Sequence, residues 1–307
     1  MTPTLRVEPQ PSGFGAAVIG VDISRPLPPE VLDAVKAAFA AHSVISFPDQ
    51  PLDHPQLEAF TLQWGAFGWD PYVAPLADRP HILEVRRDAD EKSAPFGGFW
   101  HSDWSFQKTP PAITILHSKV VPPVGGDTLY ADGYRAWEAL TPAFQAMITP
   151  LRALHSAGGP YGEKGFYATE KGRTGMTILP SADADKTWSH PLVRVHPVSG
   201  RTALFVNPIY TVGVEGMSVA ESKALLDFLF RHSTSDEFVY RHVWSANMLT
   251  MWDNRCCQHN ATGGYDGYAR VHASHHRRRR GADSLHGRAL MLGSPRPNKV
   301  RFRAVDR

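Results

Sequence analysis

The stretch Gly98-Phe99-Trp100-His101-Ser102-Asp103-Trp104-Ser105-Phe106 decides how this chain is interpreted. On an extended strand its His-x-Asp pattern directs His101 and Asp103 to one face, because residues i and i+2 share a face there. A distant imidazole, that of His259, would complete a set of two histidines and one carboxylate. Three such ligands cover one face of a metal and leave the other open, which is typical of non-haem Fe(II) sites. In a chain with 15 histidines the motif alone is weak evidence, and a solvated or core histidine is the more common alternative.

Further motifs follow in order along the chain. They are Gly125-Gly126-Asp127-Thr128, His190-Pro191-Leu192-Val193-Arg194, His196-Pro197-Val198-Ser199-Gly200, Leu204-Phe205-Val206-Asn207, Trp252-Asp253-Asn254-Arg255, Gln258-His259 and Arg270. Together with the His-x-Asp stretch, this series resembles the taurine dioxygenase / 2,4-dichlorophenoxyacetate dioxygenase (TauD/TfdA) family of Fe(II)- and 2-oxoglutarate-dependent oxygenases. The resemblance begins near Gly20-Val21-Asp22 and extends through most of the chain.

The resemblance implies roles for five side chains. His101, Asp103 and His259 would hold Fe(II), and the remaining positions would take the 2-oxo acid end of 2-oxoglutarate and O2. Arg270 would pair with the distal carboxylate of 2-oxoglutarate, which a planar guanidinium can grip through two parallel hydrogen bonds. Thr128 would assist as a hydroxyl donor, although without the family it would be interpreted as an ordinary turn residue. A carboxylate at Asp103, where related halogenases carry a small residue, favours hydroxylation.

The implied reaction is oxidative decarboxylation of 2-oxoglutarate to succinate, coupled to hydroxylation of a C–H bond in a small organic substrate. Where that carbon bears a heteroatom, the product would collapse and the bond would be cleaved. Two alternatives belong to other classes. A zinc-dependent hydrolase could use the same ligands, but it would need a nearby general base and would give Arg270 no role. A catalytically silent metal-binding jelly roll would not need the co-substrate residues.

Four residues are candidates for contact with the substrate. In taurine-specific members of the family an arginine four residues after the 2-oxoglutarate arginine binds the sulfonate, and here that position is Ser274. A histidine used for the same sulfonate aligns with Asp70. These differences disfavour taurine and favour a neutral or cationic, fairly apolar substrate. Phe99 and Trp104, together with Trp100, could line a wider aromatic pocket, although aromatic residues beside strands are more often part of the core.

Composition limits the other classes of function. The 307 residues are 42% hydrophobic and 20% charged, and the net charge of +2 argues against a polyanion-binding surface. No run of 18 apolar residues and no signal-peptide pattern are present, and Cys256 and Cys257 are adjacent, a poor geometry for a disulfide. We therefore expect a cytoplasmic protein with a small-molecule substrate and with neither nucleic-acid nor membrane partners. A homo-oligomer, either a dimer or a tetramer, is left open.

The pattern of elements predicts a mainly β fold with flanking helices and a double-stranded β-helix core (a cupin-like jelly roll). Helices are expected after Pro28-Pro29, after an N-cap at Asp53 and ending at Gly65, and after a capping box at Ser218. Strands are expected at residues 44–47, 81–85, 112–117, 192–195, 203–206, 238–243 and 248–252. We expect residues 1–307 to form a single domain. The composition of residues 158–190 fits an active-site lid and a disordered linker equally well, and the resemblance to the family implies a lid insertion there.

The end of the chain departs from the family. An apolar strand is expected after Arg270, whereas this chain continues as His275-His276-Arg277-Arg278-Arg279-Arg280. The simplest interpretation is a solvated basic loop, and a patch for nucleic acid or an acidic partner is an alternative. A third interpretation is an altered reading frame, because a shift of one nucleotide in GC-rich codons can turn this run into Thr-Ile-Ala-Gly-Asp-Gly.

Overall fold

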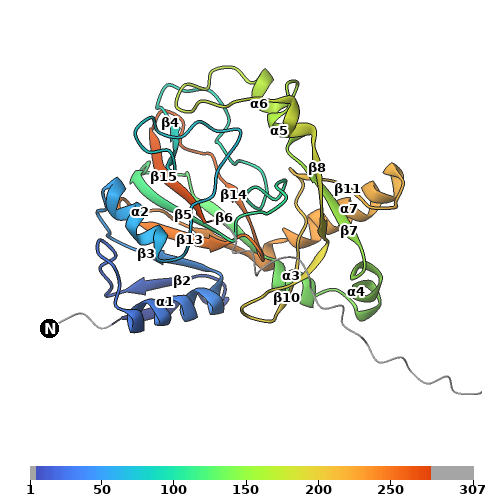
Figure 1. Ribbon diagram of the computed structural model, residues 1–307, viewed down its shortest axis with the longest axis horizontal. Coiled ribbons are helices and arrows are strands. Elements are labelled where there is room, and N and C mark those ends of the chain that lie inside the picture. The colour runs from blue at the N-terminus through green and yellow to red at the C-terminus, as the bar shows by residue number, and fades with distance from the viewer. Residues whose placement is uncertain (1–4, 278–307) are drawn as a thin grey trace, which may run out of the picture.

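The computed structural model describes residues 5–277, which are built mainly from β-strands with helices around them (Figure 1). The largest sheet has the strand order β1-β2-β3-β13-β5-β15-β4, and its neighbours are antiparallel except for β2 and β3. Its strands are β1 (Arg6–Pro9), β2 (Ala16–Ile19), β3 (Val44–Phe47), β4 (Leu83–Arg87), β5 (Ile113–Val120), β13 (Leu249–Asp253) and β15 (Arg270–Arg277).

Three smaller sheets complete the β structure of the described residues, in the orders β12-β6-β14, β11-β7-β8 and β10-β9. Their strands are β6 (Thr128–Asp132), β7 (Arg152–Ser156), β8 (Thr187–Pro191), β9 (Val193–Val195), β10 (Thr202–Leu204), β11 (Thr211–Val214), β12 (Val239–His242) and β14 (Cys257–Ala261). The β12-β6-β14 sheet packs against the large sheet, because the rings of Tyr130 on β6 and Trp252 on β13 lie 5.4 Å apart. The two sheets form the layers of the predicted jelly roll.

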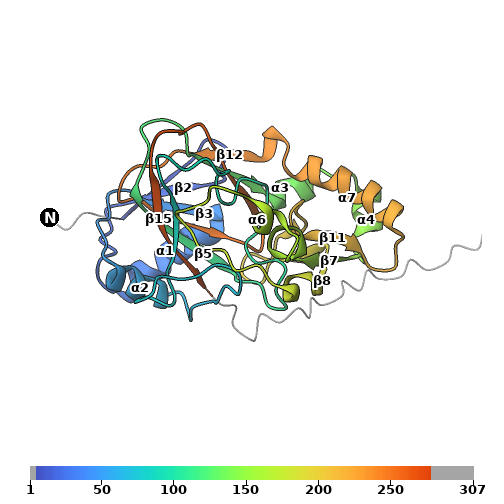
Figure 2. The ribbon, with the colours of Figure 1, turned by 90° about the horizontal axis from the view of Figure 1, so that it is seen from above.

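The helices lie outside these layers (Figures 1 and 2). Near the N-terminus, α1 (Pro29–His42) contacts β2 and β3, and α2 (His54–Leu62) contacts β15. The remaining helices are α3 (Gly133–Glu138), α4 (Pro142–Ile148), α5 (Gly158–Tyr161), α6 (Phe166–Thr169) and α7 (Val219–Ser233), with 3-10 turns at Ala182–Asp185 and Asp236–Phe238.

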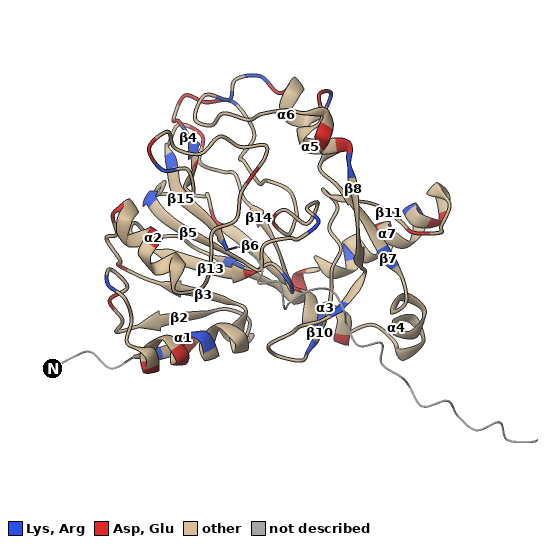
Figure 3. Ribbon diagram, in the orientation of Figure 1, with Lys and Arg blue, Asp and Glu red and all other residues tan. Residues whose placement is uncertain are grey.

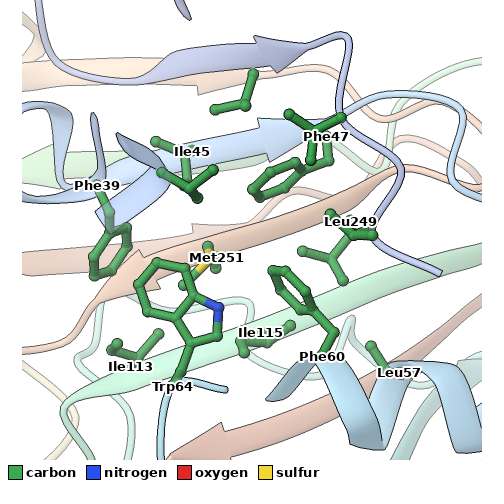
Figure 4. Close-up of a cluster of buried hydrophobic side chains, with 14 of the residues drawn as sticks. Phe39, Ile45, Phe47, Leu57, Phe60, Trp64, Ile113, Ile115, Leu249 and Met251 are labelled. Atoms are coloured by element: carbon green, nitrogen blue, oxygen red, sulfur yellow. The ribbon is translucent and has the colours of Figure 1, made fainter. Parts of the chain in front are cut away.

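One hydrophobic core lies between the large sheet and the helices α1 and α2 (Figure 4). Phe39 of α1 and Phe60 of α2 meet Ile45, Ile115 and Met251 of three neighbouring strands, and all five side chains are buried. Truncating one of these rings to alanine would cost about 3–5 kcal/mol of stability, because the cavity left behind closes incompletely. This core makes the large sheet a rigid wall for whatever lies on its other face.

Strand β5 shows how that wall has two faces. Ile113 and Ile115 belong to the core under the helices, whereas Thr114 and Leu116 line a cavity on the opposite side. This is the period-two alternation of a strand that is buried on both faces.

The predicted helix starts are confirmed. Asp53 caps α2 by accepting a hydrogen bond from Gln56 N at 2.8 Å, and Ser218 caps α7 in the same way. The predicted end of α2 at Gly65 is wrong, because the helix stops at Leu62. Trp64 lies beyond the helix but still packs edge-on against Phe39, with ring centroids 5.4 Å apart. The apolar stripe therefore continues past the helix that the periodicity predicted.

Each predicted strand is found, with ends shifted by up to three residues. The strands missed by the sequence analysis are short and lack an apolar alternation: β1, β2, β6, β7, β8, β11 and β14. Two of them matter for function, because β6 begins at Thr128 and β14 carries His259.

The prediction of a solvated basic loop from His275 is wrong for the residues that the structure describes. His275, His276 and Arg277 complete β15 and are buried, with His276 opposite Thr114 of β5. The His275 imidazole contacts the Thr61 hydroxyl of α2, Nδ1 to Oγ1, at 2.8 Å. Strand β15 carries only two apolar residues, Val271 and Ala273, too few to predict a strand from an apolar pattern. Residues 278–280 lie outside the described residues.

Basic and acidic positions are interspersed along the surface elements, as on α1 with Glu30, Asp33 and Lys36 (Figure 3). Within residues 5–277 there is no helix of the length and apolar character needed to cross a membrane.

Candidate active site

The two predicted histidine ligands meet through the backbone. His101 N donates to His259 O at 3.0 Å, and His259 N donates to His101 O at 2.7 Å, which makes an isolated antiparallel bridge. His259 lies on β14 and is held opposite Tyr130 of β6. The ring centroids of the two histidines are 4.1 Å apart. The bridge therefore places two residues that are far apart in the sequence side by side.

Asp103 reaches this pair from a turn. The expectation that His101 and Asp103 share an extended strand is wrong, because residues 103–106 form a turn and Trp104 has a left-handed φ of 47°. Asp103 Oδ1 nevertheless lies 3.4 Å from His101 Nε2 and 3.8 Å from His259 Nε2. One ligand atom from each of the three residues lies within 4.8 Å of the others. The three predicted ligands are therefore brought together by tertiary contacts and not by strand alternation.

The second carboxylate oxygen of Asp103 is held away from His101 and His259. Thr114 Oγ1 donates to Asp103 Oδ2 at 2.5 Å, and Asn254 Nδ2 donates to Thr114 Oγ1 at 2.8 Å. Asn254 Oδ1 in turn accepts from Asp103 N at 3.3 Å and from Trp252 Nε1 at 3.1 Å. These contacts leave Oδ1 as the oxygen that faces the two imidazoles. The Trp252-Asp253-Asn254-Arg255 motif thus orients Asp103, a role that the sequence did not reveal.

The two predicted co-substrate residues lie on facing sheets. Arg270 is the first residue of β15, is 5% exposed, and donates from Nε to Gly126 O at 3.2 Å. Thr128 is the first residue of β6, is buried, and accepts from Trp244 Nε1 at 3.0 Å. Both line the same cavity as the three candidate ligands. No acidic group among the described residues lies within salt-bridge distance of Arg270.

That cavity has a volume of about 380 Å³, and it also reaches all four candidate substrate residues, Asp70, Phe99, Trp104 and Ser274. Asp70, Trp104 and Ser274 are buried, whereas Phe99 is 45% exposed and lies nearer the opening. The structure therefore gathers the candidate metal, co-substrate and substrate residues around one cavity, whereas the prediction that Trp100 lines it is wrong.

The sequence analysis did not predict much of the aromatic lining of this cavity. Part of it comes from the predicted lid segment at residues 158–190, whose sequence is rich in glycine and polar residues and has no clear period. The missed aromatic residues that line the cavity are Phe96, Tyr161, Phe166, Tyr167 and Tyr210. They are joined by ring contacts, such as Tyr161 with Tyr167 at 5.3 Å between centroids.

Residues 6–279 match the model of one protein family, the taurine catabolism dioxygenase TauD, TfdA family. The chain belongs to this family. It is 35% identical over 261 residues to the alpha-ketoglutarate-dependent 2,4-dichlorophenoxyacetate dioxygenase of Cupriavidus pinatubonensis, covering 80% of this chain and 88% of the relative. It is 31% identical over 269 residues to the alpha-ketoglutarate-dependent sulfate ester dioxygenase of Pseudomonas putida, covering 87% of each.

Solved structures agree with this assignment. The crystal structure of AAD-2 in complex with Mn(II) and N-oxalylglycine superposes with a TM-score of 0.73 at 28% identity, covering 90% of this chain and 97% of that one. The predicted jelly roll and the predicted enzyme class, a 2-oxoglutarate-dependent dioxygenase that uses Fe(II) and O2, are confirmed at the level of the TauD/TfdA family. The zinc-dependent hydrolase and the silent jelly roll find no support in these relatives.

The donor atoms of this TauD/TfdA-family member fit Fe(II). His101 Nδ1 lies 2.7 Å from Phe99 O and is therefore the protonated nitrogen, which leaves the Nε2 lone pair directed at the site. Burial, reinforced by His101, lowers the pKa of His259 to about 3, so that imidazole is also neutral. Burial alone would raise the pKa of Asp103, but the charge that the imidazoles of His259, His101 and His276 carry when protonated outweighs it and holds the pKa well below its usual range, so the carboxyl group ionises readily. Two neutral imidazoles and a carboxylate suit this metal.

The environment of Arg270 fits the distal carboxylate of 2-oxoglutarate. Burial lowers the pKa of Arg270 from its model-compound value, yet a guanidinium stays charged in proteins. A buried charge without an acidic partner is costly, and a bound carboxylate would neutralise it.

His276 is a cavity residue that the sequence analysis placed in a loop. Its Nε2 lies 3.5 Å from Asp103 Oδ2, and its ring stacks on Trp104 at 3.8 Å between centroids. Arg270, Ser274 and His276 are separated by even numbers of residues, so a strand puts all three on the cavity face. This even spacing could have identified His276 as a cavity residue, but only if β15 had been recognised as a strand.

Proposed function

We propose that this chain hydroxylates a C–H bond of a small, largely apolar substrate other than taurine, with bond cleavage where the carbon bears a heteroatom. His101, Asp103 and His259 would hold Fe(II), and Arg270 would bind 2-oxoglutarate with help from Thr128. When bound, the metal and 2-oxoglutarate supply an oxidant from O2, with succinate and carbon dioxide as co-products. One observation carries the proposal: the three ligand atoms line the same cavity as a buried arginine that has no acidic partner within residues 5–277.

The residues of the chain have separate tasks in this scheme. Thr114 and Asn254 keep Asp103 in one orientation, so that its Oδ1 faces the metal position. Arg270 fixes the far end of the co-substrate through a bidentate contact that lysine could not reproduce. The hydroxyl of Thr128 is already oriented by Trp244, so it needs little rearrangement to assist. These groups position the reactants, and positioning is the main contribution of the protein in cofactor chemistry.

The exclusion of taurine rests on the two positions that would have to bind its sulfonate. Ser274 offers a hydroxyl, and Asp70 offers a carboxylate that would repel a sulfonate. Both line the cavity. Phe99 and Trp104 would instead contact an apolar part of the substrate.

We further propose that residues 158–190 act as a lid within a single domain spanning residues 1–307. Tyr161, Phe166 and Met176 of this segment line the cavity together with Asp70 and His259 from other parts of the chain. A segment in this position would shield the reaction from water when the substrate is bound.

A small molecule as the partner, without nucleic acid, is supported by the interspersed charges of the described surface. A cytoplasmic location is supported by two cysteines that are free and buried. The Sγ atoms of Cys256 and Cys257 lie 3.8 Å apart, which is contact distance and not a bond.

Succinate formation tests the proposed function. The purified chain is incubated with Fe(II), ascorbate, O2 and 2-oxoglutarate against taurine, alkyl sulfates, phenoxyalkanoates, amino-acid derivatives and apolar amines. Succinate above the substrate-free rate, with a hydroxylated or cleaved product, is expected for an apolar member of the panel and not for taurine. Absence of succinate under all conditions, or activity with Zn(II) alone, would overturn the proposal.

A further inference from the structure

Asp70 is a buried carboxylate on the cavity wall. It is 8% exposed and lies in the loop before Tyr72. Its Oδ1 accepts from Tyr72 N at 2.7 Å and from Val73 N at 3.1 Å, and the Trp104 side chain is a further hydrogen-bond partner. An ionised carboxylate has room for about four hydrogen bonds, so these neutral donors fix its position and leave capacity for another. Within the described residues, no arginine, lysine or histidine forms a salt bridge with Asp70.

The other charged groups of the cavity already have assignments under the proposed function. Asp103, His101 and His259 serve the metal, and Arg270 serves 2-oxoglutarate. His276 stacks on Trp104 and faces Asp103. Among the described lining residues this leaves Asp70 as the charge without an assigned counterpart, and it leaves no lysine or second arginine for an anionic substrate.

Much of the rest of the cavity lining is aromatic. Phe96 stacks on Tyr167 at 5.5 Å between centroids, and Phe99 meets Phe166 edge-on at 5.8 Å. Tyr161 lies beside Tyr167. Aromatic faces carry negative electrostatic potential and attract organic cations, whereas they give an anion nothing comparable.

We propose that the substrate is a protonated amine carrying an apolar or aromatic group, and that the carboxylate of Asp70 binds its ammonium. This inference rests on the proposed function and names its substrate class. Asp70 supplies the charge-assisted hydrogen bond, and the aromatic wall surrounds the rest of the molecule. The substrates named for the two relatives differ in this respect, because 2,4-dichlorophenoxyacetate carries a carboxylate and a sulfate ester carries a sulfate.

Binding of matched probes tests the inference without turnover. The chain is loaded with Mn(II) and 2-oxoglutarate without O2 and titrated by calorimetry with 2-phenylethylamine, 2-phenylethanol and phenylacetate, which share a ring and differ in charge. A second set, hexylamine with hexan-1-ol and hexanoate, covers an aliphatic group. The amines should bind about 10- to 100-fold more tightly than the matched alcohols, as expected for one charge-assisted hydrogen bond. Equal or weaker binding of both amines would overturn the proposal.

Variants identify the group responsible. Asp70→Asn keeps an oxygen that can accept from Tyr72 N and Val73 N but loses the charge, and it should lose the preference for amine over alcohol. Asp227→Asn is the matched control, because Asp227 lies on α7 outside the cavity and pairs with Lys223. It should keep the preference. An amine preference that survives in Asp70→Asn would overturn the role of Asp70.

The same experiment separates this inference from the proposed function. Succinate formation by the wild-type chain with Fe(II) and O2 reports the dioxygenase, whichever probe binds. Succinate without an amine preference removes the inference and leaves the function standing. An amine preference without succinate under any condition removes the function.

Discussion

The structure brings together two buried triads of residues that commonly bind metals. In each, one ligand atom per residue lies within 4.8 Å of the others: His101, Asp103 and His259 in the first, and His196, Asp253 and Cys256 in the second. By residue type and spacing alone the two triads look alike. They differ in what surrounds the carboxylate.

Asp253 is already paired with a cation, the guanidinium of Arg255. Arg255 donates to it from Nε at 2.8 Å and from a terminal nitrogen at 2.6 Å, and His196 Nε2 lies 3.0 Å away. Burial alone would raise the pKa of Asp253, but Arg255 and His196 outweigh it and hold the pKa far below its usual range. None of the second triad lines the main cavity. A metal would have to displace a guanidinium from a closed site.

Asp103 has neutral donors on one oxygen and an open cavity beside the other. The arginines beside the two triads also differ. Arg255 is paired with Asp253 inside the protein, whereas Arg270 has no acidic partner among the described residues. The comparison shows that clustered ligand-type residues suggest a binding site when their charges are left uncompensated. A cluster that is neutral by itself is more simply part of the structure.

The largest expected difference between the triads is in metal binding. Metal binding should be abolished in each of the variants His101→Ala, Asp103→Ala and His259→Ala, because a site with only three protein ligands cannot lose one and still hold the metal. His196→Ala and Cys256→Ala are the matched controls and should retain one metal per chain. Metal content after anaerobic loading with Fe(II), or calorimetry with Mn(II), measures the effect. Complete loss of metal in a folded His196→Ala protein would contradict the view that only the first triad binds the metal.

The second triad should instead control stability. Arg255→Met leaves Asp253 buried without its main cation, and breaking such a pair costs about 3–5 kcal/mol. Urea unfolding of the metal-free protein measures this, and the double variant Asp253→Asn/Arg255→Met should recover part of the loss. A change below about 1 kcal/mol would contradict the view that Arg255 compensates the charge.

The unpaired arginine should control co-substrate binding. Arg270→Ala should raise the KM for 2-oxoglutarate by about 30-fold or more, since losing one member of a buried charge pair costs about 2–5 kcal/mol. Thr128→Ala should cost less, about 1–3 kcal/mol, because one hydrogen bond is lost. Steady-state kinetics with varied 2-oxoglutarate measures both. Equal effects of the two variants would count against the proposed pairing.

Asp70 extends the comparison to a carboxylate that forms no salt bridge within residues 5–277. Burial raises its pKa from 3.8 to about 6, a shift worth roughly 3 kcal/mol, and its titratable neighbours are His276, Tyr72, Tyr161 and Tyr210. A raised carboxyl pKa stabilises the fold at low pH, and this contribution is lost as the pH rises through about 6. Asp70→Asn should therefore be more stable than the wild type above pH ~7, by up to about 3 kcal/mol, with the difference closing below pH ~4.

Urea unfolding of both metal-free proteins across this pH range measures the difference. A wild type that is the more stable of the two at neutral pH would show that Asp70 has a cationic partner in the folded protein.

The smallest expected effect concerns the neutral donor that sets Asp103 apart from Asp253. Thr114→Val removes the hydroxyl that holds Asp103 Oδ2, and it should weaken metal binding by about 10- to 100-fold, as is usual for outer-sphere hydrogen bonds. Thr114→Ser keeps the hydroxyl and should restore most of the affinity. Mn(II) titration measures both variants. Equal losses in Thr114→Val and Thr114→Ser would point to packing of the methyl group as the cause.

The sequence by itself determined the chemistry of the candidate site. The selection of His101, Asp103, His259 and Arg270 as candidates was possible because residue type and order along the chain carry the resemblance to the family, and these residue types suit metal and carboxylate binding. Helix starts were predictable for a similar reason, since the caps at Asp53 and Ser218 bond to backbone groups three residues away. Such signals are local, and a local signal can be read without knowing the rest of the fold.

The tertiary structure alone decided which of these residues meet and what surrounds them. The bridge between His101 and His259, the turn that presents Asp103 and the burial of His276 on β15 all depend on partners distant in sequence. Strand β15, despite its histidines and arginines, forms because β4 supplies hydrogen bonds along Arg270–Ser274 and β5 supplies them along the other edge as far as Arg277. The same applies to the two triads, whose residue types are alike. Packing placed a guanidinium against Asp253 and left Asp103 facing an open cavity, because the energy of a buried charge depends on all the groups around it.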